Sequence, residues 1–253
     1  MAFENLLNPI LNPLLVSTGY FWTLFILSFV IALIITVIYK YTTNQSLMKD
    51  LKSELKEFQK QAKNLRDKPE EAMKVQKRMM ESNSKYMMHS FKPMLFTFLP
   101  IIIFFGWMSA HLAYYPILTG EEFSVTMNFN EGVGGDVMIS LPDMLTSVNN
   151  INQTILANQA KWVLKGEDGE YLINYNFNGV TYSNEILITS EKTYKQPLTK
   201  IKEGGIKDIK VNIEPVKPFG FLSLFGWKPG WLGAYIILSI IFSTVIRKLM
   251  KVY

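Results

Sequence analysis

Residues 20–39 read YFWTLFILSFVIALIITVIY and contain no charged side chain. A helix rises about 1.5 Å per residue, so this stretch is long enough to cross the roughly 30 Å hydrocarbon core of a bilayer. The uncharged run extends over residues 5–39, and two more lie at 93–120 and 229–246. The sequence therefore predicts an α-helical membrane protein with three transmembrane helices, at residues 20–39, 93–114 and 229–246.

Charged residues are divided unevenly among the segments that these stretches separate. Residues 40–92 contain 13 Lys/Arg and 7 Asp/Glu, whereas residues 115–228 contain 10 Lys/Arg and 13 Asp/Glu, and the tail at 247–253 is basic. Segments on the cytoplasmic side of a membrane accumulate Lys and Arg. We therefore expect a protein of the cell (plasma) membrane whose N-terminus and residues 115–228 lie outside, with residues 40–92 and the tail in the cytosol.

Several classes of function are disfavoured by the composition. The chain of 253 residues has no cysteine, so neither disulfides nor thiol chemistry are available. It has no G-x-x-x-x-G-K phosphate-binding loop. Its two histidines, His89 and His111, have no metal-ligand or nucleophile partner at motif spacing. We expect a protein that is not an enzyme and that carries no cofactor and no metal.

Two Asn-Pro pairs, Asn8-Pro9 and Asn12-Pro13, interrupt the apolar residues before the first predicted span. Proline removes a helical hydrogen bond and clashes with the preceding turn, so the pattern argues against a continuous helix over residues 1–19. The same residues lack the basic start of a cleaved signal peptide. We expect residues 1–19 to form an interfacial segment at the outer membrane surface.

The basic segment at 40–92 has the pattern of two amphipathic helices. Apolar positions step by four and three residues along 51–65 and again along 72–86, on either side of a break at Asp67-Lys68-Pro69. Two such helices joined by a short turn predict a cytosolic antiparallel coiled-coil hairpin. The heptad positions are Leu51, Leu55, Phe58, Ala62 and Leu65 in the first helix, and Ala72, Val75, Met79, Ser82 and Tyr86 in the second.

The segment between the second and third spans changes to a β pattern. Residues 125–129 and 171–177 alternate apolar and polar side chains, as half-buried strands do. Asn178-Gly179, placed directly before residues 180–189, is a strong signal for a two-residue hairpin turn. The sequence therefore predicts a small β-rich extracytoplasmic domain inserted between the second and third spans.

Two parts of the same segment, 115–228, carry weaker patterns. We interpret residues 146–162 as a helix or a long loop. Glycine and proline are frequent over 215–229, which we expect to be a linker that returns the chain to the membrane.

Hydroxyl side chains are scattered through the predicted spans. Ser and Thr commonly hold membrane helices together, and this is one interpretation. In the other, they line a shallow polar groove, which would help a passenger segment because a charged side chain costs about 2.5–3.5 kcal/mol at the bilayer centre. The groove residues would be Thr23, Ser28, Thr36, Thr97, Ser239 and Ser243.

Methionines cluster between the break at Pro69 and the second span. Because the methionine side chain is flexible and polarizable, a methionine-rich surface can contact many different apolar sequences. Individual members, such as Met79, have the alternative of filling the seam of the hairpin. The cluster favours a surface for hydrophobic clients, made of Met79, Met80, Met87, Met88 and Met94.

The lysine excess of the hairpin has three interpretations. The lysines can form a solvated face, as the charge bias of cytoplasmic loops requires. They can also contact anionic lipid headgroups or ribosomal RNA, both of which present phosphates.

These features resemble the archaeal YidC-like proteins of the YidC/Oxa/Alb membrane-insertase superfamily, a three-span group related to the third subunit of the eukaryotic ER membrane complex. The most similar string is GWLGAYIILSIIFSTVIRKLMK at 230–251, followed by KYMMHSFKPMLFTFLP at 85–100 and by the hairpin at 47–92. The resemblance covers about 140 of the 253 residues and leaves out the β-rich segment.

The resemblance implies a chaperone-like insertase that moves nascent or short membrane proteins from the cytosol into the bilayer without nucleotide hydrolysis. Its implied partners are these clients, the ribosome or anionic lipid at the hairpin, and a partner membrane subunit. Bacterial relatives carry a basic residue in the groove of their first core helix, but residues 5–39 contain none, so groove polarity must come from hydroxyls and backbone. The alternative is a membrane-anchored receptor or scaffold that acts through its β-rich domain.

Overall fold

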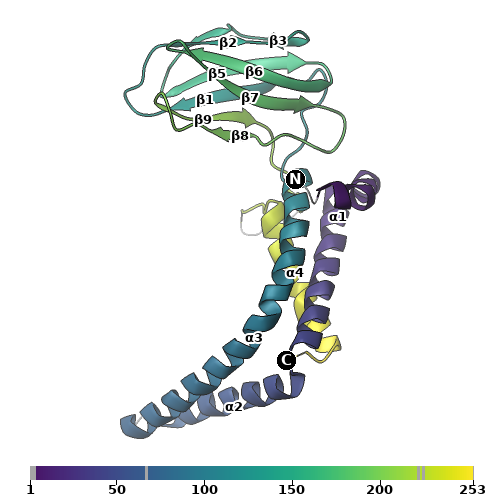
Figure 1. Cartoon of the computed structure of the whole chain (residues 1–253), viewed down its shortest axis with the longest axis vertical. Coiled ribbons are helices and arrows are strands. Elements are labelled where there is room, and N and C mark those ends of the chain that lie inside the picture. Colours follow the sequence, from purple (N-terminus) through teal and green to yellow (C-terminus); the bar gives the residue numbers. More distant parts are fainter. Residues whose placement is uncertain (1–3, 66–67, 221–222, 224–225, 253) are drawn as a thin grey trace. The chain divides into compact units, whose positions relative to one another are not determined.

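The computed structural model in Figure 1 describes residues 4–65, 68–220, 223 and 226–252. The chain forms two compact units. The helical unit contains Phe21–Gly106 and the described part of Leu232–Tyr253, and the β-rich unit contains Leu7–Tyr20 and Trp107–Trp231. Among the described residues, three helices are long and apolar enough to cross a membrane, which confirms the number of predicted spans.

The first of these helices, α1 (Glu4–Thr42), runs through both Pro9 and Pro13 and has a non-helical residue at Gly19, with φ 80° and ψ 178°. The prediction that the prolines prevent a helix in this segment is therefore wrong for its described residues. The break falls instead at Gly19, where a positive φ favours a residue without a side chain.

The two prolines are tolerated because they are one turn apart, so the hydrogen bonds that they remove lie on the same side of the helix. Both side chains lie on its exposed side. The last turn before Gly19 is completed by hydroxyls: Ser17 Oγ donates to Pro13 O at 2.8 Å, and Thr18 Oγ1 donates to Leu14 O at 2.8 Å. Both hydroxyls bond back to carbonyls one turn earlier, whereas the carbonyls nearest the break, Leu15 O and Val16 O, accept from Lys192 Nζ.

A hairpin of two helices follows, made of α2 (Gln45–Asn64) and α3 (Pro69–His111). Asn44 caps the first helix by accepting a hydrogen bond from Leu47 N at 3.2 Å. All ten predicted heptad positions are buried or half-buried. All the remaining residues at 52–64 and 73–85 are exposed. The hairpin in Figure 1 is therefore joined along the face that the sequence predicts.

α3 continues without interruption from the hairpin into the second candidate span, through Pro93 and Pro100. Its 43 residues would extend about 65 Å. The span predicted at 93–114 is thus the second half of a longer helix that ends at His111.

The third candidate span, α4 (Trp231–Leu249), packs against both other long helices of the helical unit. The ring of Phe242 meets Phe25 of α1 at 5.0 Å, and that of Tyr235 meets Phe105 of α3 at 4.8 Å.

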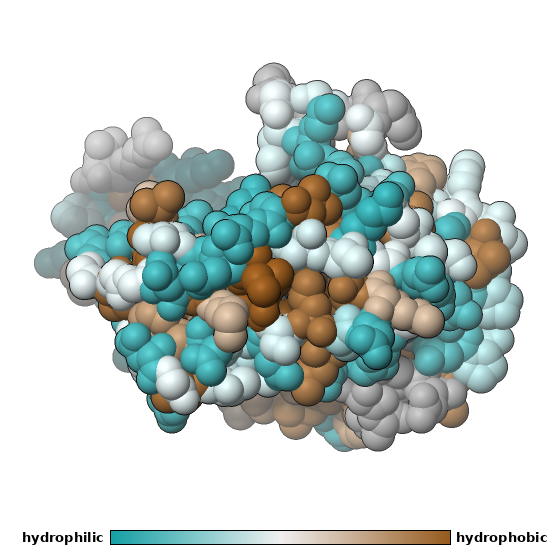
Figure 2. All heavy atoms as spheres, turned by 90° about the horizontal axis from the view of Figure 1, so that it is seen from above, coloured by the Kyte–Doolittle hydropathy of each residue, from teal (hydrophilic) through white to brown (hydrophobic). Residues whose placement is uncertain are grey.

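In chain order, α3 and α4 enclose two antiparallel sheets, which confirms the predicted β-rich insertion. The strand order is β3-β5-β1-β9-β8 in one sheet and β4-β2-β6-β7 in the other. Hydrophilic side chains cover much of the sandwich face shown in Figure 2, with hydrophobic patches between them. The strands are β1 (Phe123–Phe129), β2 (Asp136–Ser140), β3 (Leu145–Ser147), β4 (Asn152–Thr154), β5 (Gln159–Gly166), β6 (Gly169–Phe177), β7 (Val180–Ile188), β8 (Leu198–Lys200) and β9 (Ile206–Asn212).

Aromatic side chains from both sheets meet in the core of the sandwich. Trp162 of β5 and Tyr175 of β6 are fully buried, with ring centroids 5.5 Å apart. Phe129 of β1 and Phe177 of β6 meet in the same way at 5.2 Å. Trp162 Nε1 donates to Ile151 O at 3.1 Å, so its one polar atom is satisfied.

The hairpin signal at Asn178-Gly179 is confirmed. These residues join β6 to β7 with φ values of 51° and 78°, as the favoured two-residue turn requires.

The prediction of a helix or loop over 146–162 is wrong. This stretch contains the end of β3, all of β4 and the beginning of β5. In β5, Ala160, Trp162 and Leu164 face the core and alternate with Lys161, Val163 and Lys165, but this alternation begins only at the end of the predicted stretch.

The predicted linker at 215–229 includes positions 221–222 and 224–225, which lie outside the described residues. Its beginning is paired with the segment that follows α3: Val216 N donates to Ala113 O at 2.9 Å, and Tyr115 N donates to Glu214 O at 2.9 Å.

Candidate functional site

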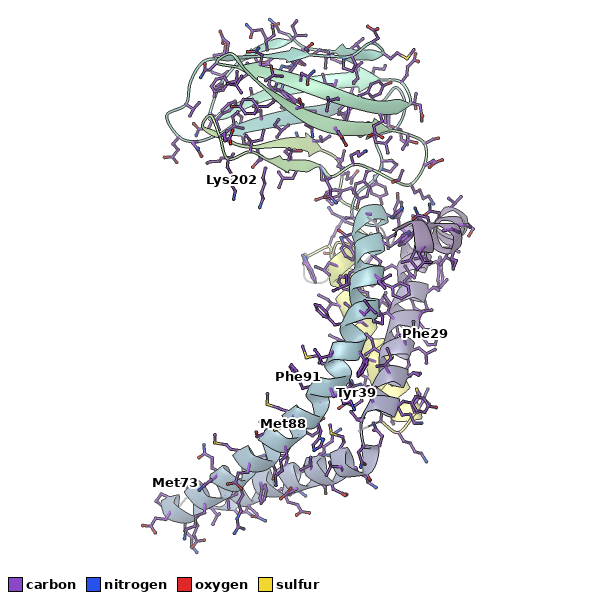
Figure 3. The ribbon with its side chains drawn as sticks, in the orientation of Figure 1. Phe29, Tyr39, Met73, Met88, Phe91 and Lys202 are labelled. Carbon is purple, nitrogen blue, oxygen red and sulfur yellow. The ribbon has the colours of Figure 1, made fainter. Side chains whose placement is uncertain are left out.

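Large apolar side chains follow one exposed face of α3. Met73, Met80, Met87 and Met94 recur every seven residues and are 71%, 64%, 63% and 61% exposed. Seven residues are close to two helical turns, so these side chains lie nearly in line. Figure 3 shows Met73, Met88 and Phe91 projecting from α3 on the side away from α2. We call Met73, Met80, Met87, Met88, Phe91 and Met94 the methionine stripe.

A shallow hollow of about 380 Å³ lies in the middle of the stripe. Met80, Met87, Met88 and Phe91 supply its apolar lining, and Asn83 and Ser84 supply polar groups. Four of the five predicted client-contact methionines, Met80, Met87, Met88 and Met94, are thus exposed on one surface.

Met79, the fifth predicted client-contact residue, lies elsewhere on the helix. It is half-buried and occupies a heptad position of the seam. This position agrees with the interpretation in which Met79 fills the seam of the hairpin. Met79 is therefore not part of the stripe.

The stripe continues into the apolar half of α3. Leu95, Phe98, Leu99 and Ile102 are all exposed, by 47% or more. No break in the helix separates them from the hairpin. One continuous apolar surface therefore leads along a single helix from the charged hairpin to the candidate span.

A second hollow, of about 340 Å³, lies between α1 and α4. Ala32 and Ile35 line it from α1, and two predicted groove residues, Ser239 and Ser243, line it from α4. Ser239 Oγ donates to Ile236 O at 2.9 Å. A hydroxyl that donates to its own helix still has lone pairs that can accept from a visiting polar group.

The other four predicted groove residues do not line this hollow. Thr23, Ser28 and Thr36 of α1 are completely buried, and Thr97 of α3 is 8% exposed. Ser28 and Thr36 donate to carbonyls of their own helix at 2.7 Å, as does Thr97 at 3.0 Å. In this conformation they belong to the packed interior of the helical unit.

Arg247 is a candidate residue that the sequence reasoning used only for topology. It follows Ser243 by four residues on α4, so Ser239, Ser243 and Arg247 share a face. Its guanidinium lies over the Tyr39 ring at 4.7 Å, and its Nε is buried without a hydrogen-bond partner among the described residues. The four-residue spacing after the two serines was the signal that could have identified it.

Tyr39 connects the charged end of α4 to the hairpin. Its hydroxyl lies 3.4 Å from Ser90 Oγ of α3. Tyr39 also forms a small apolar cluster with Met48 of α2 and Val252 of the tail. The Arg247 guanidinium therefore lies against one member of this cluster, the Tyr39 ring.

No group of three or more metal-ligating side chains occurs in the part of the chain that the structure describes. The apolar surface and the hydroxyl-lined hollow can bind and shelter other molecules.

Three candidate spans and an apolar surface on a helical hairpin define an integral membrane protein with an exposed apolar surface outside its predicted bilayer segments. Residues 4–144 match the family of integral membrane proteins described as EMC3/TMCO1-like. The chain belongs to this family, which is part of the Oxa1/YidC superfamily and whose members are generally non-catalytic. Searches of curated proteins and of solved structures found no match.

The matched region includes α1, α2 and α3 and ends just after β2. Most of the sandwich and α4 lie beyond it. Family membership therefore confirms the predicted resemblance at the level of the superfamily, while an archaeal origin stays a prediction.

Proposed function

We propose that this protein is a membrane insertase that moves short hydrophobic clients from the cytosol into the bilayer without nucleotide hydrolysis. The observation that carries the proposal is the methionine stripe, which joins the exposed apolar face of the second candidate span on one unbroken helix. Membership of the EMC3/TMCO1-like family supports an insertase role of the Oxa1 superfamily.

The stripe is suited to temporary contacts with clients. Burying a methionine side chain contributes about 1.5–3 kcal/mol, so several exposed ones provide a strong attraction for an apolar segment. The flexible side chains can adapt to different sequences. A client bound at Met80 and Met87 would lie beside a surface that becomes steadily more apolar toward Ile102.

The polar flank of the client would use the hollow between α1 and α4. Ser239 and Ser243 offer hydroxyl oxygens there, and Arg247 places a positive charge one turn beyond. In this proposal Arg247 of α4 replaces the basic residue that bacterial relatives carry on their first core helix. Thr23, Ser28, Thr36 and Thr97 would join the groove when the three long helices separate during transfer.

The distribution of charge supports a matching topology. The basic hairpin and tail would lie in the cytosol, where they contact clients and either ribosomal RNA or anionic lipid. The β-sandwich and the N-terminus would lie outside the cell membrane. A partner membrane subunit would cover part of the apolar surface.

Insertion into liposomes tests the proposal. A short membrane protein is synthesised in vitro beside liposomes that contain the full-length protein, and insertion is measured by protection from added protease. Replacing Met80, Met87 and Met88 by serine should lower insertion about tenfold, because each lost apolar contact weakens binding.

The matched control replaces Glu54, Gln59 and Gln61, exposed residues of α2 and so not part of the stripe, by serine. It should insert clients as well as the wild type. Equal loss in both variants, or no loss in the methionine variant, contradicts the proposal. If insertion also proceeds equally in protein-free liposomes, the receptor or scaffold function of the β-rich domain becomes the better explanation.

A further inference from the structure

The β-rich unit contains a cavity of about 500 Å³ at its helical end. Asn12 and Val16 line it from the N-terminal part of α1, His111 from the end of α3, and residues 190–193 from the loop between β7 and β8. A volume of this size is typical of small-molecule sites.

In one wall of the cavity, α1 packs against the end of α3. Trp107 Nε1 donates to Asn8 Oδ1 at 3.0 Å, and the Trp107 ring stacks on the buried His111 ring at 4.5 Å. Asn12 follows Asn8 by one turn, as His111 follows Trp107. The side-chain oxygen of Asn12 is buried and accepts no hydrogen bond from any described residue. A buried acceptor of this kind is costly unless a donor reaches it.

The loop between β7 and β8 adds charge to the cavity. Lys192 Nζ donates to Leu15 O at 2.9 Å and to Val16 O at 3.5 Å, at the end of the helical turn before Gly19. An ammonium group has three donor hydrogens, so one remains for an anion. Glu191 beside it is exposed and lines the same cavity. The cavity thus combines the ammonium group of Lys192 with two acceptors, the amide oxygen of Asn12 and the carboxylate of Glu191.

The residues around the cavity also belong to the ends of two candidate membrane spans. Asn12 and Val16 lie near the start of Leu6–Thr42, and His111 is the last residue of Pro69–His111. Val16, which lines the cavity, is 67% exposed, and Ile10 of the same helical segment is 69% exposed. This combination of a polar cavity and an apolar approach matches the layered chemistry of a lipid better than that of a soluble ligand.

We propose that this cavity binds the headgroup of a phospholipid whose polar end carries a hydrogen-bond donor, either an amine or a hydroxyl. The phosphate accepts from Lys192, and the donor reaches Asn12 Oδ1 after a small turn of that side chain, or the Glu191 carboxylate. The acyl chains follow the apolar side chains of Ile10 and Val16. This binding is independent of client insertion.

Native mass spectrometry of the full-length protein in detergent tests the proposal with three added lipids. Phosphatidylethanolamine and phosphatidylglycerol carry the donor, and phosphatidylcholine lacks it. The first two should bind about tenfold more tightly, the size expected for one or two well-placed hydrogen bonds. The Asn12→Leu variant should bind all three lipids with similar, weak affinity, and Lys192→Met should weaken binding of every phospholipid.

Asn8→Leu is the matched control, because it makes the same change one turn away and removes the bond to Trp107 without lining the cavity. It should keep the lipid preference even if the protein becomes less stable. Thr193→Trp places a large side chain in the cavity from the loop and should also abolish lipid binding. This variant tests the proposal if Asn12→Leu fails to fold. Equal binding of phosphatidylcholine by the wild type, or an unchanged preference in both cavity variants, overturns the proposal. Soluble glycerophosphoethanolamine has the same headgroup but no acyl chains. If it displaces the lipid at equal concentration, the site binds a free phosphodiester, and the proposal that its ligand is a membrane lipid is overturned.

Discussion

The β-sandwich and α3 use large apolar side chains in opposite ways. Trp162, Tyr175 and Phe177 are at most 1% exposed, whereas Met88 and Phe91 are 72% and 58% exposed. The sandwich buries its largest aromatic side chains in its own core, as a domain with two packed layers does. α3 leaves its apolar side chains exposed, and exposed apolar patches of this kind mark sites of interaction with other molecules.

The contrast between buried and exposed apolar side chains is clearest within the hairpin half of α3. Its seam positions pack against α2, and its charged positions are solvated, yet Met80 and Met87 remain exposed between them. In the proposed topology this part of the helix lies outside the lipid. A client or a partner subunit would then cover it.

The largest effect should come from the sandwich core. Trp162→Ala removes a fully buried side chain and should destabilise the sandwich by about 3–5 kcal/mol. Hydrogen exchange of β5 and β6 in the full chain measures this loss, with Lys161→Ala as the exposed control. Because the two units are compact separately, α2 should keep its protection. Equal loss of protection in α2 would show that the two regions do not fold independently.

Tyr194 should have the next largest effect, because it fastens the loop after β7 to the segment after α3. Its hydroxyl donates to Ser109 O and accepts from Ala113 N at 3.2 Å, and burial raises the pKa of this phenol. Tyr194→Phe should cost about 1–3 kcal/mol, because it leaves two backbone groups without a partner. Faster exchange of residues 109–115 is the measurement.

Tyr171→Phe is the control for this prediction, since its hydroxyl makes an exposed bond to Glu167 O. It should change exchange little. If the two variants behave alike, the Tyr194 contacts do not stabilise the base of the sandwich.

Ser243→Leu should have a smaller effect, on function rather than stability. The larger apolar side chain occupies the hollow between α1 and α4 and removes a hydroxyl. Insertion of a client with a charged flank should fall about three- to fivefold, equivalent to about 1 kcal/mol or less. A client with an uncharged flank is the control. Equal loss for both clients would indicate a packing defect instead of a polar passage.

The smallest effect should come from Lys195 on the sandwich surface. Hydrogen bonds to Glu170 at 2.6 Å and to Glu185 at 3.1 Å raise the pKa of this lysine. A raised pKa in the folded state stabilises the protein below the ordinary lysine pKa of about 10.4, and the contribution is lost as pH rises through the raised value. Lys195→Ala should cost well under 1 kcal/mol at pH 8, because surface ion pairs are screened. The difference between variant and wild type in thermal unfolding should disappear at high pH.

The sequence predicts those parts of the fold whose patterns are local. Charge-free runs indicate the spans, and heptad spacing indicates the seam face of α2. Asn178-Gly179 indicates its turn because the required backbone conformation depends on those two residues. The helix through Pro9 could not be predicted in this way, since the hydrogen bond between Asn8 and Trp107 that holds it joins residues far apart in the sequence.

The candidate site was predictable to a similar extent. The methionine surface follows from composition and spacing along one helix. The burial of Thr23 and Ser28 depends on which face of α1 meets its neighbours, and residues from distant parts of the chain decide that. The contact of Arg247 with Tyr39 likewise joins residues far apart in sequence.

Site-specific photocrosslinking during translation detects whether clients contact the methionine stripe. A photoreactive residue at Met87 lies on the stripe, and the same residue at Lys85 lies on an exposed but different face of α3. With ribosomes that translate a short membrane protein, we expect crosslinks to the nascent chain from position 87 at several times the yield from position 85. Equal yields from the two positions, or no crosslink from position 87 while the client still inserts, would contradict this expectation.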